Sequence, residues 1–222
     1  MTTSSSESVM PRLRRLAMSP RSAAASPAAS VPDQERCGLC AAAVPADHRH
    51  LMDVTAQALR CVCEACGVLF DQRAAGDGHY RRVTDRCQKL SDFALTDEQW
   101  AGLGVPVTLA FFARSTAAGT VVGHYPGPLG ATEAVIDADT WRAIERDNPA
   151  LATLEPDVEA LLVDRRRVPP GYWLVAIDTC YSLIGLMRRH WKGLSGGPLV
   201  QDAVAEFFVE LDRRSAIARA RA

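Results

Sequence analysis

The sequence predicts an α+β protein in which a small metal-knuckle module precedes an antiparallel-sheet domain with helices on one face. Two Cys-x-x-Cys pairs lie close together near the N-terminus, and paired strand patterns then alternate with helix patterns in the order ββ-α-ββ-α-α. A composition of 48% hydrophobic and 23% charged residues is typical of a folded protein. We expect a tail over 1–34, a cysteine-rich metal-binding module over 35–75 and an α+β domain over 76–222.

Residues 1–34 are predicted to form a disordered tail, because Ser, Ala, Pro and Arg dominate and too little apolar surface is available to offset the entropy of ordering. Arg14 and Arg15 suggest a twin-arginine signal, but Ser19 and Pro20 interrupt the apolar stretch that such a signal needs. No run approaches the roughly 18 apolar residues of a membrane span. We therefore expect a cytoplasmic protein without a membrane-spanning segment.

The cysteines carry the strongest signal. Two of the seven stand alone (Cys87 and Cys180), and five fall within thirty residues, a pattern that suits free thiols in a reducing compartment rather than a disulfide framework. Two residues between paired cysteines let both thiolates reach one metal ion, and 22 residues between the pairs leave room for a hairpin. Two such pairs predict one tetrahedral site for zinc or a single iron. The predicted ligands are Cys37, Cys40, Cys63 and Cys66.

Three neighbouring residues leave the ligand set open. Cys61 lies two positions before Cys63 and could replace a ligand or simply pack. His48 and His50 lie between the two cysteine pairs, so a site of three cysteines and one histidine is an alternative. The other interpretation is that these histidines are surface residues or partners that orient a ligand.

The first half of the α+β domain is predicted from a capping box and two strand patterns. Thr96 and Gln99 have the spacing of a capping box, so a short helix should begin there and be limited by Gly102. Residues 105–114 and 120–125 are rich in β-branched and aromatic side chains and should form two strands, the second ended by Pro126-Gly127-Pro128.

The second half is predicted to continue with a helix, two strands and two more helices. The first helix covers about 139–146, and strands over 158–163 and 172–177 follow. Asp178 or Thr179 should cap the next helix, which Gly193 ends. The last helix should cover about 198–216 and bury Val200, Val204, Phe207, Phe208 and Leu211.

The predicted site favours a structural role. Four protein ligands leave no open position on the metal, so we favour zinc whose binding stabilises the fold. Iron in the same ligand set would carry one electron, as in rubredoxin, which is the alternative. Residues 35–90 hold eight basic and seven acidic side chains, and four thiolates with a divalent metal add negative charge, which disfavours a nucleic-acid-binding zinc ribbon. The basic cluster of Tyr80, Arg81, Arg82 and Arg86 is better explained by salt bridges.

The sequence predicts no catalytic residues. His79, His124 and His190 have no repeated ligand spacing, and Cys180 has no base at motif distance. Glu133, Asp137 and Asp139 cluster, but helix capping explains them; an enzyme would need Glu133, Asp137 and His124 in one cleft.

Several segments resemble a family of uncharacterised bacterial proteins with an N-terminal zinc-ribbon or rubredoxin-like module. The similar segments, which span roughly 35–212, are 35–40, 48–51, 61–66, 80–83, 109–112, 126–133, 154–163 and 189–191. Genes of that family tend to lie beside those of uptake nickel–iron (NiFe) hydrogenases. The resemblance implies an accessory or maturation role for a hydrogenase, or a redox partner of one. The family has an aromatic residue where Cys87 stands, which argues against a function for Cys87.

We therefore expect a non-enzymatic accessory protein with a structural four-cysteine zinc site that docks to, or helps to mature, an uptake hydrogenase. The alternatives are a rubredoxin-like iron electron carrier serving a hydrogenase and a nucleic-acid-binding zinc ribbon.

Overall fold

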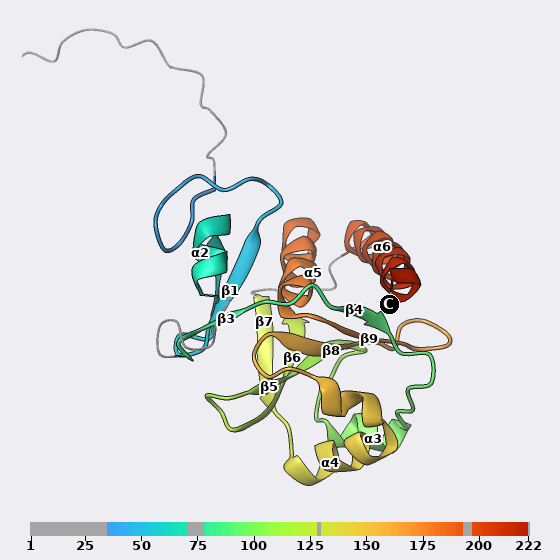
Figure 1. Cartoon of the computed structure of the whole chain (residues 1–222). Helices are drawn as coiled ribbons and strands as arrows, with labels where there is room; N and C mark the ends of the chain where they lie inside the picture. Colours follow the sequence, from blue (N-terminus) through green and yellow to red (C-terminus); the bar gives the residue numbers. More distant parts are fainter. Residues whose placement is uncertain (1–34, 71–77, 128–129, 193–196, 222) are drawn as a thin grey trace, which may run out of the picture. The chain divides into compact units, whose positions relative to one another are not determined.

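A six-stranded antiparallel sheet forms the centre of the larger part of the chain (Figure 1). The computed structural model describes residues 35–70, 78–127, 130–192 and 197–221, so the predicted tail over 1–34 lies outside the described residues. In sheet order the strands are β4 (Cys87–Lys89), β9 (Gly171–Ala176), β8 (Glu159–Asp164), β5 (Leu109–Ser115), β6 (Thr120–Gly127) and β7 (Gly130–Val135).

The neighbouring interior strands β8 and β9 explain why the sheet is covered on both faces. Every residue of β8 and β9 is buried. Because successive side chains of a strand point to opposite faces, Leu162 and Trp173 enter one core while Leu161 and Leu174 enter the other. The first core is closed by α5 (Ile177–His190) and α6 (Pro198–Arg221), and the second by α3 (Asp97–Gly102) and α4 (Ala138–Asp147).

The predicted α+β class with an antiparallel sheet is confirmed, but the placement of all helices on one face is wrong. Figure 1 shows α5 and α6 on one side of the sheet and α3 and α4 on the other. The physical reason is that the apolar runs of β8 and β9 have no polar face, and α4 turns the apolar side chains of Trp141 and Ile144 inward.

Most predicted helices are confirmed. Thr96 and Gln99 form the capping box, with the Gln99 backbone N–H donating to Thr96 Oγ1 at 3.1 Å. Asp137 caps α4. The last helix starts at Pro198 as predicted and continues to Arg221. The predicted cap of α5 is wrong, because that helix begins at Ile177, has no side-chain cap, and leaves Asp178 available for a different contact.

The predicted end of the second strand is also wrong. β6 continues through Pro126 to Gly127 and pairs with β7, a strand that the sequence analysis did not predict. The pairing of β6 with β5 extends only to His124. The missing N–H of Pro126 therefore interrupts no hydrogen bond to β5, which is how a strand tolerates proline.

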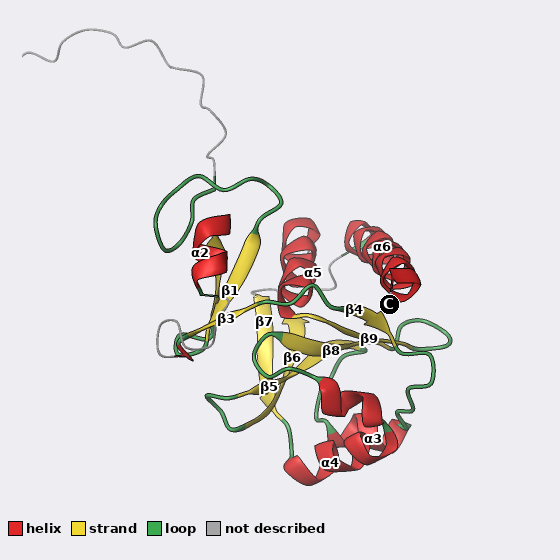
Figure 2. Cartoon of the chain, in the orientation of Figure 1, coloured by secondary structure: helices red, strands yellow, loops and turns green. Residues whose placement is uncertain are grey.

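A second, three-stranded sheet lies between the first cysteine pair and the large sheet in sequence. Its strand order is β2 (Ala58–Val62), β1 (Arg49–Asp53), β3 (Tyr80–Arg82), and α2 (Glu64–Leu69) follows β2. The hairpin expected between the two cysteine pairs is therefore confirmed as β1 and β2. Figure 2 shows that residues 35–48, which lead into β1, form a loop. Met52 of β1 belongs to the core beneath α5 and α6.

Among the described residues, no helix combines the length and the apolar character needed to span a bilayer.

Candidate metal centre

The four predicted ligands come from two backbone knuckles. Cys37 and Cys40 lie on a tight turn in which the Ala41 N–H donates to the Cys37 carbonyl at 2.9 Å. Cys63 precedes the first residue of α2, and Cys66 lies in its first turn. The N–H of Gly38 donates to the carbonyl of Cys61 at 2.8 Å, which holds the first knuckle against the end of β2.

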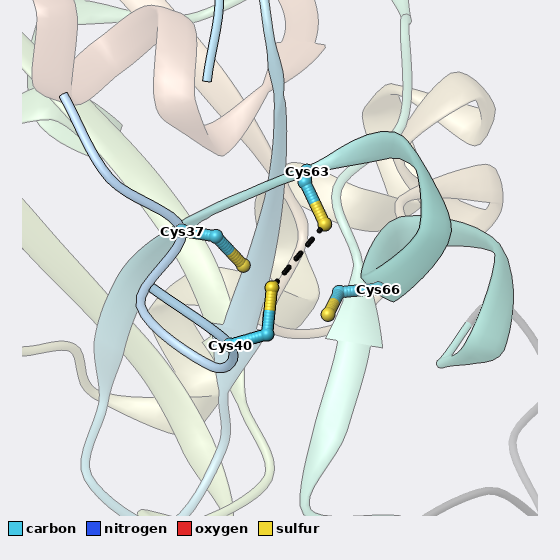
Figure 3. A group of neighbouring side chains, drawn as sticks. All are labelled: Cys37, Cys40, Cys63 and Cys66. Carbon is cyan, nitrogen blue, oxygen red and sulfur yellow. Dashed lines mark hydrogen bonds between the residues drawn. The ribbon is translucent and has the colours of Figure 1, made fainter. Parts of the chain in front are cut away.

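The four sulfur atoms point toward a common centre (Figure 3). All four lie within 4.8 Å of one another, and Cys40 Sγ and Cys63 Sγ are 3.6 Å apart. A tetrahedron with Zn–S bonds of about 2.3 Å has sulfur–sulfur edges of about 3.8 Å. The four thiols are therefore close enough together for one tetrahedral ion to bind them all, and all seven cysteines of the chain are free of disulfides.

The backbone also prepares one sulfur to carry negative charge. Burial raises the pKa of the Cys37 thiol, but the backbone N–H groups of Cys63, Cys40 and Leu39 donate to its sulfur and outweigh burial, so that its pKa falls from 9.0 to about 6. The pKa of Cys66 rises to about 12 through burial and the neighbouring thiols.

Few apolar side chains surround the centre. Among the described residues, the buried cluster beside the cysteines is Cys37, Val44, Leu51 and Val62. Phe70 and Tyr80 pack against this cluster, and their rings meet edge to face with centroids 5.2 Å apart. So small a core gives little hydrophobic stabilisation, and a metal ion would supply what the side chains do not. These residues fit a tetrahedral ion of the zinc or iron type, and the four thiols would hold it.

The three alternative ligands do not join this centre. Cys61, His48 and His50 form a group of their own, in which one ligand atom of each lies within 4.8 Å of the others. The hairpin register explains the grouping, since His50 is paired directly with Cys61 across β1 and β2. The sequence analysis named these residues but could not separate them from the four cysteines.

Two residues near this second group were not predicted. Glu35 Oε1 lies 3.1 Å from Cys61 Sγ, and Asp178 Oδ2 lies 3.0 Å from His50 Nδ1. Asp178 gave no local signal because it is 128 positions from His50 and looked like a helix cap.

The remaining candidate functional residues make packing or capping contacts. His124 stacks on Phe111 at 4.8 Å, and Cys180 is fully buried, which raises the pKa of its thiol well above 9.0. His124 and Glu133 line one hollow, whereas Asp137 is occupied as the cap of α4. The cleft that an enzyme with these three residues would need is therefore not formed.

The arginines of the basic cluster form ion pairs with carboxylates of the same chain. Arg81 binds Asp157 at 3.2 Å, and Arg86 binds Glu159 at 2.9 Å. Arg82 pairs with Asp85 at 3.8 Å. These arginines lie beside carboxylates of the same chain, as the sequence analysis favoured.

Comparison with known protein families identifies the family to which the chain belongs. The family of unknown function DUF5947 matches residues 36–215, which include the four cysteines, the second group and both sheets. The chain belongs to this family. No curated protein and no solved structure matches the chain. For this member of DUF5947, the arrangement of its own side chains is thus the basis for inferring function.

Proposed function

We propose that this DUF5947 protein is a non-enzymatic accessory protein whose four clustered cysteines bind one structural Zn²⁺. The observation that carries the proposal is the convergence of four thiols within 4.8 Å of one another, beside a small buried cluster that among the described residues comprises Cys37, Val44, Leu51 and Val62. Zn²⁺ has no redox chemistry, and four thiolates close its coordination sphere. The ion would stabilise the module rather than bind a substrate, and the reduced thiols suit a cytoplasmic location.

Elemental analysis with a visible absorption spectrum tests the identity of the metal. Protein purified from its native host should contain zinc and be colourless. A red protein with the absorption of ferric iron in four thiolates would overturn zinc in favour of the rubredoxin-like alternative.

The proposed partner is an uptake NiFe hydrogenase subunit or one of its maturation factors. The sequence resemblance described above supports this partner. The module also has a surface suited to a protein partner, because Val68 and Leu69 at the end of α2 are 66% and 63% exposed. Their position on the helix that follows Cys63 would make docking dependent on the metal.

Affinity capture from the host lysate tests the partner. The intact chain should enrich a hydrogenase subunit or maturation factor, and Val68→Ser with Leu69→Ser should abolish the enrichment. Val209→Ser is the matched control, because Val209 is an equally exposed apolar residue on α6. Absence of any hydrogenase-related protein, or equal capture by the double variant, would contradict the proposed partner.

A further inference from the structure

We propose that His48, His50 and Cys61 form a second metal site, distinct from the four-cysteine centre, for a divalent transition-metal ion of the zinc type. The two groups share no residue, and one ligand atom from each of the three side chains lies within 4.8 Å of the others. This inference does not depend on the proposed function, because none of its ligands belongs to the four-cysteine centre.

The hairpin fixes the three side chains in place. His50 and Cys61 are directly opposite each other in the antiparallel pairing of β1 and β2. Side chains at such positions are close enough to share a ligand. His48 lies two residues before His50, and the two imidazole rings are 4.8 Å apart. The site thus rests on backbone pairing rather than on loose surface side chains.

Both histidines have their Nδ1 atoms occupied, which leaves Nε2 for a metal. Nδ1 of His48 lies 2.8 Å from the carbonyl oxygen of Pro45, which can only accept, so this nitrogen carries the proton. Nδ1 of His50 lies 3.0 Å from Asp178 Oδ2. A carbonyl or carboxylate at one ring nitrogen is the usual way in which proteins orient a metal-binding imidazole.

One atom of the group lacks a partner. Nε2 of His48 is buried and accepts no hydrogen bond from any described residue, and its side chain is only 7% exposed. A buried polar atom without a partner is costly and needs an explanation. A metal ion among these three side chains would satisfy it.

Glu35 is placed to complete the coordination. Its Oε1 accepts from the Cys61 thiol at 3.1 Å, and its Oε2 lies 3.9 Å from His48 Nε2. Metal binding would release the Cys61 thiol proton to solvent and free the carboxylate to become the fourth ligand. Two imidazoles, one thiolate and one carboxylate suit Zn²⁺ or a similar ion, whereas Ca²⁺ and Mg²⁺ prefer all-oxygen sites.

A surface hollow reaches the two histidines of the proposed site. His48, His50 and Asp178 line one hollow of about 480 Å³ at the protein surface. Because Asp178 belongs to α5, the same contact joins the small sheet to the large core. Occupancy of this site would therefore strengthen the contact between the two parts.

Metal stoichiometry tests the second site. Metal-free full-length protein is dialysed against excess Zn²⁺ and then against buffer, and bound zinc is counted by mass spectrometry. The intact chain should hold two ions, and His48→Gln with His50→Gln should hold one. His79→Gln is the control, since the His79 ring lies against Thr55 Oγ1 at 2.9 Å and belongs to neither group of candidate ligands, and this variant should keep two ions. One ion in the intact chain, or two in the double variant, would overturn the site.

Cobalt binding provides a readout that folding defects do not imitate. The first Co²⁺ equivalent should give the strong sulfur-to-cobalt absorption of four thiolates, and the second a weaker increment from one thiolate. Asp178→Asn leaves every ligand present and should weaken only the second equivalent by about 10–100-fold. An unchanged second equivalent in this variant, or loss of the four-thiolate spectrum in the double histidine variant, would contradict the proposal.

Discussion

At the scale of single residues, the Cys37 sulfur shows how the backbone prepares the metal centre. Three N–H groups donate to it and lower its pKa to about 6 despite burial. Such hydrogen bonds are set by the knuckle conformation, which includes the positive φ of 60° at Ala41. A lowered thiol pKa favours the deprotonated sulfur that a metal ion binds.

Replacing one of the four cysteine ligands should abolish the binding of one metal ion. We expect Cys40→Ser to lower the zinc content by one ion per chain, because three thiolates cannot close the tetrahedron, and Cys40 is exposed so that no cavity is left. Cys87→Ser is the control: its thiol lies 3.3 Å from Ser215 Oγ and can be replaced by a hydroxyl. Elemental analysis of both variants checks this, and equal zinc content would contradict it.

Two glycines should respond in opposite directions. A Cβ at Gly171 would overlap the buried Trp173 ring, so Gly171→Ala should lower the free energy of unfolding by about 1–3 kcal/mol. Gly185 lies within α5, and no atom lies within 4 Å of the position that a Cβ would take there. Gly185→Ala should therefore raise the free energy of unfolding by about 0.5–1 kcal/mol. Urea unfolding measures the change in unfolding free energy for both variants. A Gly171→Ala variant that is more stable than the intact chain would contradict the close packing of Trp173 against Gly171.

At the scale of elements, Arg81 ties the small sheet to the large one. It extends from β3 to the carboxylate of Asp157, whose side chain is almost completely buried and also accepts from Thr116. Removing the arginine would leave that buried carboxylate short of a partner.

We therefore expect Arg81→Ala to lower the free energy of unfolding by about 1–3 kcal/mol. Arg142→Ala is the matched control, because Arg142 and Asp139 form an exposed pair on α4 and such pairs contribute little. Chemical unfolding of both variants checks the difference, and equal effects would show that the Arg81 contact is not a significant link.

Sequence patterns that span a few residues correctly predicted the helices and strands whose formation depends on neighbouring residues. The capping box at Thr96, the apolar face of α4 and the hairpin between the cysteine pairs are all encoded within a few residues. The start of α5 was mispredicted because Asp178 has the chemistry of a cap, yet its carboxylate faces His50 instead. The strand β7 was missed because Pro126 and Gly127 suggested a turn.

The candidate metal ligands likewise divide into a group that local spacing predicts and a group that depends on how the strands pair. The four cysteines could be named from spacing alone, since each pair is local and a tetrahedron needs two pairs. The separation of His48, His50 and Cys61 into their own group depends on the β1–β2 register, which spacing does not determine.

At the scale of the whole molecule, the two parts rely on different sources of stability. The large sheet has two extensive cores, one on each face. Among the described residues, the buried cluster beside the small sheet consists of Cys37, Val44, Leu51 and Val62, and Met52 belongs to the large core. The apolar runs of β8 and β9 are typical of strands covered on both faces, so the presence of helices on both sides of the sheet was predictable from these runs.

Removing the metal should therefore loosen one part and leave the other intact. After chelation, amide hydrogen exchange should rise in residues 37–69, because the ion supplies the missing core. Amides of β8 and β9 should stay protected, since these strands are buried along their whole length. An equal rise of exchange in β8 and β9 would contradict this division.

The most direct measurement of the central claim is an anomalous-difference map recorded at the zinc absorption edge from crystals of the full chain. We predict a peak equidistant from the sulfurs of Cys37, Cys40, Cys63 and Cys66, at about 2.3 Å from each. The absence of anomalous density between these four atoms, or a disulfide joining any two of them, would contradict the account.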